Sequence, residues 1–442
     1  MRRQLGDARP VAAVGAGALL ERLVRAGAVA GLRWRAVVAL DGLAGCSSST
    51  AAGAGLPPGC LRFEQLVAAE EAGANEPRFP DVRPAQLAVV AFTGGTTGPP
   101  KGVRISHANL VTSICQISHE AFEQSKEATE SFQEELVCSV PMYHNYGMIV
   151  VTLNRLRLGA HIVTLADPSP DSYLQALHQT KSTALALTPS LMLWLAAAPS
   201  LPAERLERVH TVMCGGSPMA PDNTERLVSR LRPSVAFQQG YGCAETTAAI
   251  CQTSRWERLL GTAGFLVPNT RAKVVGDGDV ALGTGHTGEI LVKGPQVMLG
   301  YLNDEAAMQR SFDAEGWFRT GDLGFYDDEH RFHVVDRLDE IIHVSGIHTL
   351  AVAPAELEEL LRAHPGVAAA AVVAAPHDAH GQVPRAFVVR RPSFLRLTER
   401  ELLDAVAQRT PPYKHLLGGV VFVDSLPRAP TGNVKRYLLK GR

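Results

Sequence analysis

Residues 93–102 read Thr-Gly-Gly-Thr-Thr-Gly-Pro-Pro-Lys-Gly, between an apolar run at 87–92 and a segment that opens with Ser106. The apolar run predicts a buried strand, and Ser106 predicts the N-cap of a helix that runs to about Glu123. A turn between a strand and a helix exposes backbone N–H groups, and this one adds hydroxyls and the ammonium of Lys101. We therefore expect residues 93–102, called the signature loop below, to bind an anionic phosphate.

The signature loop differs from the phosphate loop of kinases and GTPases. That motif has Gly directly before its Lys and Ser or Thr directly after it. Here Lys101 is flanked by Pro100 and Gly102, and Pro99 and Pro100 lack the backbone N–H that could bind phosphate. The sequence thus argues against a phosphate-loop kinase or GTPase. Considered alone, a Gly- and Thr-rich segment is also compatible with a flexible surface turn.

The composition is that of an ordinary globular protein with reduced cysteines. The chain has 442 residues, which predicts two or more domains, and 46% of them are apolar while 20% are charged. A net charge of −1 gives no general attraction to nucleic acid or anionic membranes, and no apolar run is long enough to span a bilayer. The seven cysteines form no C-x-x-C, which argues against a disulfide framework or a zinc site and for a reducing compartment, the cytoplasm.

The beginning of the chain allows two interpretations. The first 35 residues carry seven arginines and two acidic residues, as a mitochondrial transit peptide would. Leu19, Leu20, Leu23 and Val24 also have the spacing of an ordinary amphipathic helix, which is the interpretation that we favour.

The alternation of strands and helices predicts an α/β protein with two domains. Between residues 135 and 238, apolar strands alternate with helices, which predicts a parallel sheet covered by helices on both faces. Short strands dominate from 273 to 335 and predict a smaller β-rich subdomain, after which a new α+β unit follows. We expect a large N-terminal domain over residues 1–335, with helix-covered mixed or parallel sheets, and a small mobile C-terminal domain over residues 336–442.

Several polar and aromatic side chains stand where a ligand would bind. His144 and Tyr146 follow a strand end, where ligands gather in open α/β sheets, and would line a pocket for an organic acid. An aromatic ring such as that of Tyr241 can stack on a purine, and a carboxylate near phosphates, such as Glu245, normally implies a bridging Mg²⁺, because two anions otherwise repel each other. Asp322 lies in a predicted tight turn, from which a carboxylate can accept both ribose hydroxyls. Each residue also has a purely structural interpretation, as a satisfied histidine or a turn residue.

Six segments in this order resemble the adenylate-forming superfamily of acyl-CoA synthetases, 4-coumarate–CoA ligases and firefly-luciferase-like enzymes. They are the signature loop and the segments 141–147, 214–219, 239–246, 316–324 and 426–436. The resemblance covers essentially the whole chain, and it implies that a leading part of the large domain is missing relative to the family. It also implies a ligase that uses ATP to convert a carboxylic acid to acyl-AMP and pyrophosphate. The small domain would then rotate, and coenzyme A would take the acyl group.

The resemblance implies roles for single residues. The pyrophosphate portion of ATP would be held by Thr93, Gly94, Gly95, Thr96, Thr97, Gly98 and Lys101. The rest of the nucleotide would lie among Gly215, Gly240, Tyr241, Gly242, Ala244, Asp322 and Arg337. The acid would lie among His144, Tyr146, Gly215, Gly216 and Gly240, and Mg²⁺ would be held by Thr97 and Glu245. Catalysis would involve Lys101, His144, Glu245 and the residue at position 433.

The chain departs from the family's pattern at several of these places. Asn433 stands where the family carries the Lys that bridges the substrate carboxylate and the α-phosphate. A neutral amide cannot neutralise charge between two anions, so the replacement predicts weaker transition-state stabilisation. His343 stands where luciferase-like relatives have Lys, and the loop at 346–354 is three residues longer than usual, which affects the coenzyme A step. Ala244 replaces a Thr that contacts phosphate in most members.

Two functions follow from the resemblance and its departures. The first is an acid–thiol ligase for an aromatic or medium-to-long-chain acid, with ATP, Mg²⁺ and coenzyme A. The second is a non-catalytic relative that binds nucleotide or an acyl ligand. The last residues, Lys440-Gly441-Arg442, do not form the peroxisomal tripeptide of some relatives, so the expected compartment remains the cytoplasm.

Overall fold

The computed structural model describes most of the chain. The described residues are 2–15, 17–34, 36–39, 60–62, 81–93, 100–123, 125–165, 169–198, 206–216, 221–344, 350–429 and 432–440. Residues 94–99 of the signature loop and residues 345–349 of the lengthened loop lie outside them. The predictions for Gly94, Gly95, Thr96, Thr97 and Gly98 therefore concern residues that the structure does not describe.

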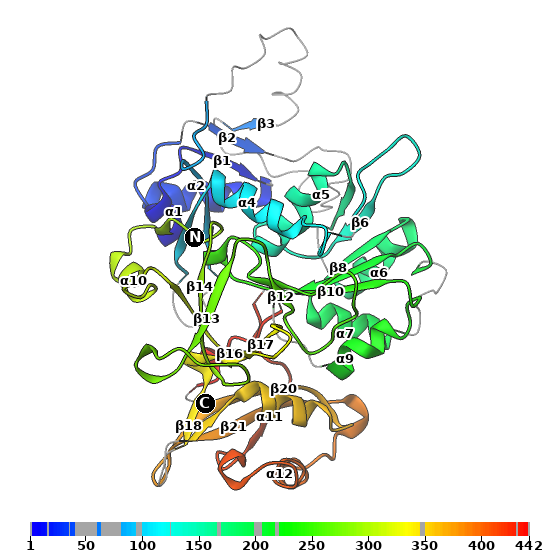
Figure 1. Ribbon diagram of the computed structural model, residues 1–442, viewed down its shortest axis with the longest axis vertical. Helices are drawn as coiled ribbons and strands as arrows, with labels where there is room; N and C mark the ends of the chain where they lie inside the picture. The colour runs from blue at the N-terminus through cyan, green and yellow to red at the C-terminus, as the bar shows by residue number, and fades with distance from the viewer. Residues whose placement is uncertain are drawn as a thin grey trace.

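A seven-stranded sheet forms the centre of the large domain (Figure 1). The strands run in the order β12-β11-β10-β9-β8-β6-β7, in which the five from β10 to β7 are parallel and β11 is antiparallel to both of its neighbours, β10 and β12. They are β6 (Glu135–Cys138), β7 (His161–Thr164), β8 (Ala184–Leu187), β9 (Thr211–Gly215), β10 (Ala236–Tyr241), β11 (Cys251–Gln252) and β12 (Phe265–Leu266). The prediction of a large domain built on helix-covered, mostly parallel strands is confirmed.

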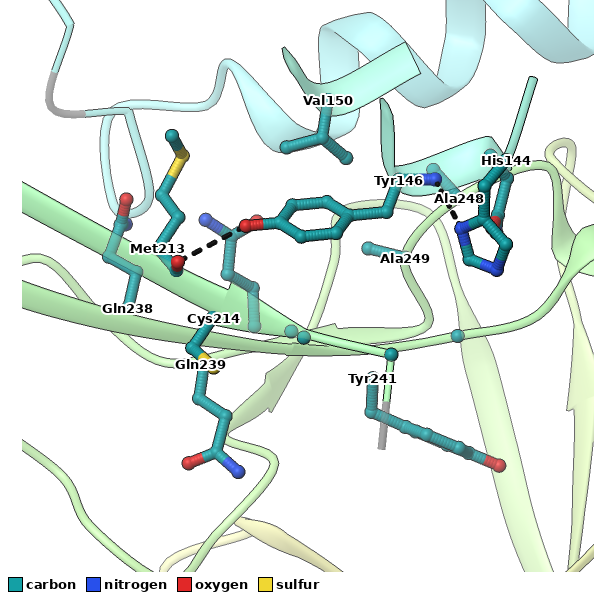
Figure 2. Close-up of a pocket in the computed structure, with 16 residues that line it drawn as sticks. His144, Tyr146, Val150, Met213, Cys214, Gln238, Gln239, Tyr241, Ala248 and Ala249 are labelled. Atoms are coloured by element: carbon teal, nitrogen blue, oxygen red, sulfur yellow. Dashed lines mark hydrogen bonds between the residues drawn. The ribbon is translucent and has the colours of Figure 1, made fainter. Parts of the chain in front are cut away.

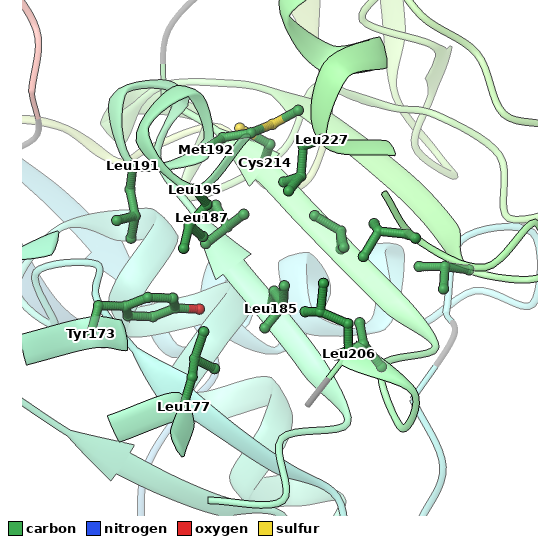
Figure 3. Close-up of a cluster of buried hydrophobic side chains, with 14 of the residues drawn as sticks. Tyr173, Leu177, Leu185, Leu187, Leu191, Met192, Leu195, Leu206, Cys214 and Leu227 are labelled. Carbon is green, nitrogen blue, oxygen red and sulfur yellow. The ribbon is translucent and has the colours of Figure 1, made fainter. Parts of the chain in front are cut away.

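Apolar side chains on both faces of this sheet explain why helices cover it. Successive residues of β8 point to opposite faces. Leu185 and Leu187 join the larger core with Tyr173 on one face (Figure 3), while Ala184 and Ala186 face the other. The first face packs against α6 (Pro170–Gln179), α7 (Pro189–Ala197) and α9 (Pro221–Val228). The second packs against the π-helix η1 (Tyr146–Leu153), which continues into α5 (Asn154–Arg157).

The signature loop joins two antiparallel strands, so the prediction that it leads from a strand into a helix is wrong. The strand β4 (Leu87–Phe92) pairs with β5 (Gly102–Ser106), and β15 (Gly300–Tyr301) pairs with the other edge of β5. Val103 and Ile105 are fully buried on one side of β5, which is the period-two pattern of a strand.

The following helix, α4 (His107–Ile117), is shorter than predicted. Ser106 is its N-cap, as expected, and its hydroxyl accepts from the Asn109 backbone N–H. The helix ends at Ile117, with Ser118 as its C-cap, rather than near Glu123, and the chain turns there so that Phe122 packs into the same apolar cluster as Ile117.

Ahead of β4 lies a small parallel sheet of three strands in the order β1-β2-β3. Its elements are α1 (Arg2–Ala8), β1 (Ala12–Gly15), α2 (Gly17–Val29), β2 (Ala36–Ala39) and β3 (Leu61–Arg62). The amphipathic helix predicted from Leu19 to Val24 is thus present within α2, next to a strand.

An antiparallel sheet in the order β13-β14-β16-β17 forms the predicted β-rich part of the large domain. Its strands are β13 (Arg271–Val275), β14 (Gly288–Lys293), β16 (Phe318–Tyr326) and β17 (Phe332–Arg337). Asp322 lies inside β16, so its assignment to a tight turn is wrong. Alternate residues of β16 are buried, and the positive φ of Gly321, 68°, adds only a local distortion within the strand.

The small domain has its own sheet and its own core (Figure 1). The strands run in the order β19-β18-β21-β20, and β22 adds a parallel partner to β21. The elements are β18 (Ile342–Val344), β19 (Leu350–Val352), α11 (Pro354–Arg362), β20 (Val367–His377), β21 (Gly381–Arg390), α12 (Glu399–Ala407) and β22 (Val420–Phe422). The exact division between the domains at residue 336 stays a prediction.

Two general features of the described residues bear on the predictions from composition. No helix in the described ranges has the length and apolar character that crossing a membrane requires. The described cysteines, which exclude Cys46, are all free thiols.

Candidate functional site

A cavity lies at the carboxyl ends of β9 and β10, where ligands bind in open α/β sheets. Its volume is about 70 Å³, and it lies between these strands and the first turn of η1 (Figure 2). The residues that line it are His144, Asn145, Tyr146, Val150, Met213, Cys214, Gly215, Gly216, Gln238, Gln239, Gly240, Tyr241, Gly242, Ala248, Ala249 and Gln252. The structure therefore brings together all the residues predicted to bind the acid.

Two aromatic rings from the start of η1 shape the acid end of this cavity. Tyr146 lies across it, and its hydroxyl donates to the backbone carbonyl of Met213 at 3.1 Å (Figure 2). The Tyr146 backbone N–H donates to Nδ1 of His144 at 3.3 Å. Burial lowers the pKa of His144, so at neutral pH its imidazole is neutral and carries its proton on Nε2. His144 can therefore donate a hydrogen bond from Nε2 without carrying a charge.

Two of the glycines beside the cavity are required by close packing. A Cβ on Gly242 would overlap the backbone carbonyl of Ala248, and a Cβ on Gly147 would overlap that of Pro141. Gly240 has open space around it, with no atom nearer than the Cys251 carbonyl at 3.9 Å from an added Cβ. The backbone of β10 at Gly240 is therefore accessible to a ligand.

Tyr241 connects the cavity to a second group of polar residues. Its ring lies on the opposite side of β10 from Tyr146 (Figure 2), and its hydroxyl donates to Oδ2 of Asp322 at 2.7 Å. Asp322 and Arg337 are paired directly across β16 and β17, and Arg337 Nε lies 3.2 Å from Asp322 Oδ1. Burial raises the pKa of Asp322, and the neighbouring guanidinium opposes that rise. The carboxylate is thus held in a fixed orientation from both sides.

Lys101 and Glu245 meet at the ring of Tyr301. Lys101 Nζ lies 4.8 Å from the ring centre, and the Tyr301 hydroxyl donates to Oε1 of Glu245 at 2.7 Å. Glu245 belongs to the short 3₁₀ helix η2 (Ala244–Thr246). The backbone N–H of Lys101 donates to the Thr93 hydroxyl at 3.0 Å, which closes the base of the signature loop. Tyr301 was not predicted as a site residue, because only the pairing of β15 with β5 reveals where it lies.

A hairpin of the small domain brings Asn433 to the mouth of the cavity. The side-chain amide of Asn433 donates to the backbone carbonyl of Gly216 at 3.0 Å. Gly432 precedes it with a φ of 91°, and a Cβ there would lie 2.8 Å from the hydroxyl oxygen of Ser190 on α7. Residue 433 is therefore placed against the cavity by tight contacts between the two domains.

Other predicted residues lie apart from this group. His343 is an exposed residue of β18, where its backbone N–H donates to Gln382, and it does not line the cavity. The glycine and threonine residues at 94–98 are outside the described part of the chain, as are residues 346–349 of the loop at 346–354.

The sequence matches known proteins along most of its length. The model of the AMP-binding enzyme family matches residues 12–302, and that of the AMP-binding enzyme C-terminal domain matches residues 356–433. The chain belongs to the AMP-binding enzyme family. The resemblance to the adenylate-forming superfamily is thereby confirmed.

Among its relatives in this family is 4-coumarate–CoA ligase 3 of Oryza sativa subsp. japonica. It is 35% identical over 390 residues, which cover 87% of this chain and 68% of the rice protein. Peroxisomal OPC-8:0-CoA ligase 1 of Arabidopsis thaliana is 36% identical over 355 residues, 79% of this chain and 63% of that protein. The structure resembles ATP-bound MatB from Rhodopseudomonas palustris with a TM-score of 0.83 at 25% identity, over 99% of this chain and 80% of MatB.

Members of the AMP-binding enzyme family use ATP, so the residues present can be tested for a metal site beside phosphates. No group of three or more His, Cys, Asp or Glu residues that would hold a metal occurs within the described ranges. Oε1 of Glu245 accepts from Tyr301, while Oε2 has no hydrogen-bond partner among the described residues. A single free carboxylate oxygen suits Mg²⁺, which usually takes one or two carboxylates and completes its shell with water and phosphate.

Proposed function

We propose that this chain activates a carboxylic acid with ATP and then transfers the acyl group to coenzyme A. The observation that supports the proposal most directly is that β10 borders both parts of the site, the cavity for the acid and the polar group for the nucleotide. The acid cavity and the Tyr241–Asp322–Arg337 group meet at Gly240 and Tyr241. Because Gly240 has no side chain and open space around it, a carboxylate in the cavity and a nucleotide on Tyr241 would meet there.

The residues around this meeting point have complementary roles in the proposed first step. An oxygen of the acid attacks the α-phosphorus of ATP, the bond from that phosphorus to the pyrophosphate oxygen breaks, and acyl-AMP and pyrophosphate result. His144 would orient the acid by donating from Nε2, Tyr241 would stack on adenine, and Asp322 would accept from the ribose hydroxyls. Lys101 would hold the phosphates. Positioning and charge stabilisation carry such a reaction without a covalent enzyme intermediate.

Mg²⁺ fits the same arrangement through Glu245. The ion would supply neutralisation of the phosphate charges when bound. Tyr301 would orient the Glu245 carboxylate, since its hydroxyl occupies one oxygen and leaves the other for the ion. Thr97 remains a proposed second protein ligand.

The second step requires the small domain to turn. We propose that the segment around Arg337 and Asp339 serves as the hinge, so that after acyl-AMP forms another face of the small domain meets the cavity. Coenzyme A would then attack the acyl carbon and release AMP. His343 and the lengthened loop belong to the small domain, and their effect on this step stays a prediction.

We expect Asn433 to limit the rate of the proposed first step, the formation of acyl-AMP. Its amide reaches the cavity but carries no charge, so two anions approach each other without the ammonium that the family places there. The favoured interpretation is a slow ligase. The alternative, a protein that binds nucleotide or an acyl ligand without turnover, is supported by the same residue.

Carboxylate-dependent exchange between ATP and labelled pyrophosphate tests the proposal. The substrates would be benzoate, 4-coumarate and octanoate, with the chain as it stands and with Asn433→Lys. We expect slow exchange by the chain as it stands. In Asn433→Lys the exchange rate should rise about 100-fold, which is the usual effect of one preorganised charged group. Gln408→Lys adds the same charge at an exposed residue of the small domain and should change nothing.

The outcomes separate the two interpretations. Exchange by the chain as it stands, together with acyl-CoA formation, supports the ligase. ATP binding by calorimetry without exchange in either form supports the non-catalytic interpretation. Equal exchange by the Asn433→Lys and Gln408→Lys variants would contradict the role given to position 433.

A further inference from the structure

The end of the acid cavity opposite His144 is lined by a methionine that rests on a buried arginine (Figure 2). Met213 lies on β9, on the same face as Tyr146, and its side chain lines the cavity (Figure 2). Its Sδ lies 2.9 Å from Nη2 of Arg155, which comes from α5 on the other side of this core layer. Arg155 itself does not line the cavity, because Met213 stands in front of it.

Arg155 is fixed in position by two carboxylates. Its Nη1 lies 3.2 Å from Glu134 Oε2 and 3.2 Å from Glu123 Oε1, and only 2% of the arginine side chain is exposed. Burial raises the pKa of Glu134, and Arg155 is the main group that opposes this rise. A buried charge with two such partners has little freedom to move, since leaving either carboxylate would uncover an unpaired charge.

The other cations around this cluster, Arg157, Lys126 and Arg232, are exposed or half exposed, so none of them adds a buried positive charge. His210 lies 3.4 Å from Glu134, but burial lowers its pKa to about 4, so it is neutral at pH 7. The Arg157 guanidinium lies 3.9 Å from Glu123 and is half exposed. A second carboxylate from a diacid would therefore be a third anion around the single buried guanidinium. This end of the cavity is unsuited to an anionic group.

A thioether is a flexible group and a weak acceptor, so Met213 would usually move aside for a ligand. Here the fixed guanidinium holds its sulfur across the end of the cavity. The cavity itself is small, with a volume of about 70 Å³. A chain longer than the distance from the mouth to Met213 would have to displace a methionine anchored on a buried ion pair.

We infer that Arg155 is a specificity-determining residue that anchors Met213 as the end wall of the acid cavity and so selects compact monocarboxylic acids over long-chain acids and diacids. The inference rests on the proposed function and adds the substrate class to it. Arg155 acts through Met213, so it positions the wall and does not touch the substrate.

The test measures KM and kcat for benzoate, octanoate, dodecanoate and malonate by ATP–pyrophosphate exchange, in the Asn433→Lys background. We expect benzoate to have the lowest KM. Met213→Ala should lower the KM for octanoate and dodecanoate about tenfold, the effect of opening one methylene-sized or larger space, while the KM for ATP stays constant. Met213→Leu keeps the volume and should keep the preference.

The anchor is tested by Arg155→Met combined with Glu134→Gln, which removes both buried charges at once. With Met213 intact, we expect this double variant to lower the KM for octanoate relative to benzoate, as Met213→Ala does. Leu156→Ala, at the exposed neighbouring position of the same helix, should leave all four KM values unchanged. A merely structural role of Arg155 would lower kcat for every acid alike, and that result would overturn the inference.

Failure of the proposed function is distinguishable from failure of this inference. If no acid supports exchange in any variant, the four acids are titrated calorimetrically into the folded protein. Tighter binding of octanoate to Met213→Ala and to the double variant would then still support the end wall. Unchanged binding of every acid in both would contradict it, whatever the exchange assay shows.

Discussion

At the scale of single residues, the candidate site depends on carboxylates whose surroundings differ. Asp322 is buried and held by Tyr241 and Arg337, whereas Glu245 is held on one oxygen only by Tyr301. The first arrangement suits a fixed acceptor for neutral hydroxyls, and the second leaves an oxygen for a cation. The two acidic residues therefore have distinct proposed roles.

The role of Asp322 leads to a prediction for nucleotide affinity. Asp322→Asn keeps the shape but replaces one charged acceptor, and hydrogen bonds to charged groups contribute about 1.5–3 kcal/mol. We expect ATP to bind roughly 10 to 100 times more weakly, as measured by calorimetry. The same substitution at the exposed residue Asp328 should have no effect. Equal affinity in both variants would show that Asp322 does not contact the nucleotide.

Residue types and their order in the sequence predict most of the candidate site. His144, Tyr146, Tyr241, Glu245 and Asp322 stand in motifs whose chemistry is readable locally. Three features were not readable in this way: the contact of Tyr301 with Lys101 and Glu245, the hydrogen bond from Asn433 to Gly216, and the support of Met213 by Arg155. Each depends on segments that lie far apart in the sequence and meet only through strand pairing, helix packing or domain docking.

At the scale of elements, the errors concerned strands that contain or adjoin glycine and proline. The segment 102–106 contains only five residues, and its neighbouring glycine and prolines suggested a loop. In β16 the sequence Thr-Gly-Asp suggested a turn, although alternate burial makes it a strand. The helical segment at 146–157 begins as the π-helix η1, whose wider turn leaves no signature in a 3.6-residue pattern.

The turn after β10 gives a prediction at this scale. Gly242→Ala would place a methyl group on the backbone carbonyl of Ala248, which cannot move without disturbing β11. We expect a loss of about 1–3 kcal/mol in the free energy of unfolding, as for other overpacked sites. Urea denaturation measures it, with Gly283→Ala as the control, because a Cβ at Gly283 meets nothing within 4 Å. A loss no greater than that of the control would contradict the packing argument.

At the scale of the whole molecule, the connection between the two domains is rich in charge. Glu340 is buried just after the proposed hinge, and burial raises its pKa while Arg436 and Lys440 oppose the rise. Asp336 accepts from the backbone N–H groups of Arg337 and Ala355, at 2.8 and 2.9 Å, which ties the end of β17 to the start of α11. The position of the small domain therefore depends on ionised side chains.

The pKa of Glu340 predicts a pH dependence of stability. Because the folded state binds this proton more tightly than the unfolded chain does, stability decreases as pH rises from the unfolded pKa of about 4.3 through the raised folded value. Glu340→Gln removes this term, so its Tm should exceed that of the parent near pH 7, and the difference should vanish below about pH 4. Glu359→Gln on the exposed side of α11 is the control. Parallel Tm curves for Glu340→Gln and the parent would contradict the prediction.

The hydrogen bond between Asn433 and Gly216 has a consequence for how salt acts on the protein. The bond joins two uncharged groups, and dissolved ions screen charges far more than they weaken a dipolar contact of this kind. The contact of the Asn433 hairpin with the large domain should therefore be nearly independent of ionic strength. In Asn433→Lys, attraction between the new ammonium and the phosphates adds a screened contribution, so the advantage of that variant should be greatest in dilute buffer and shrink as salt is added.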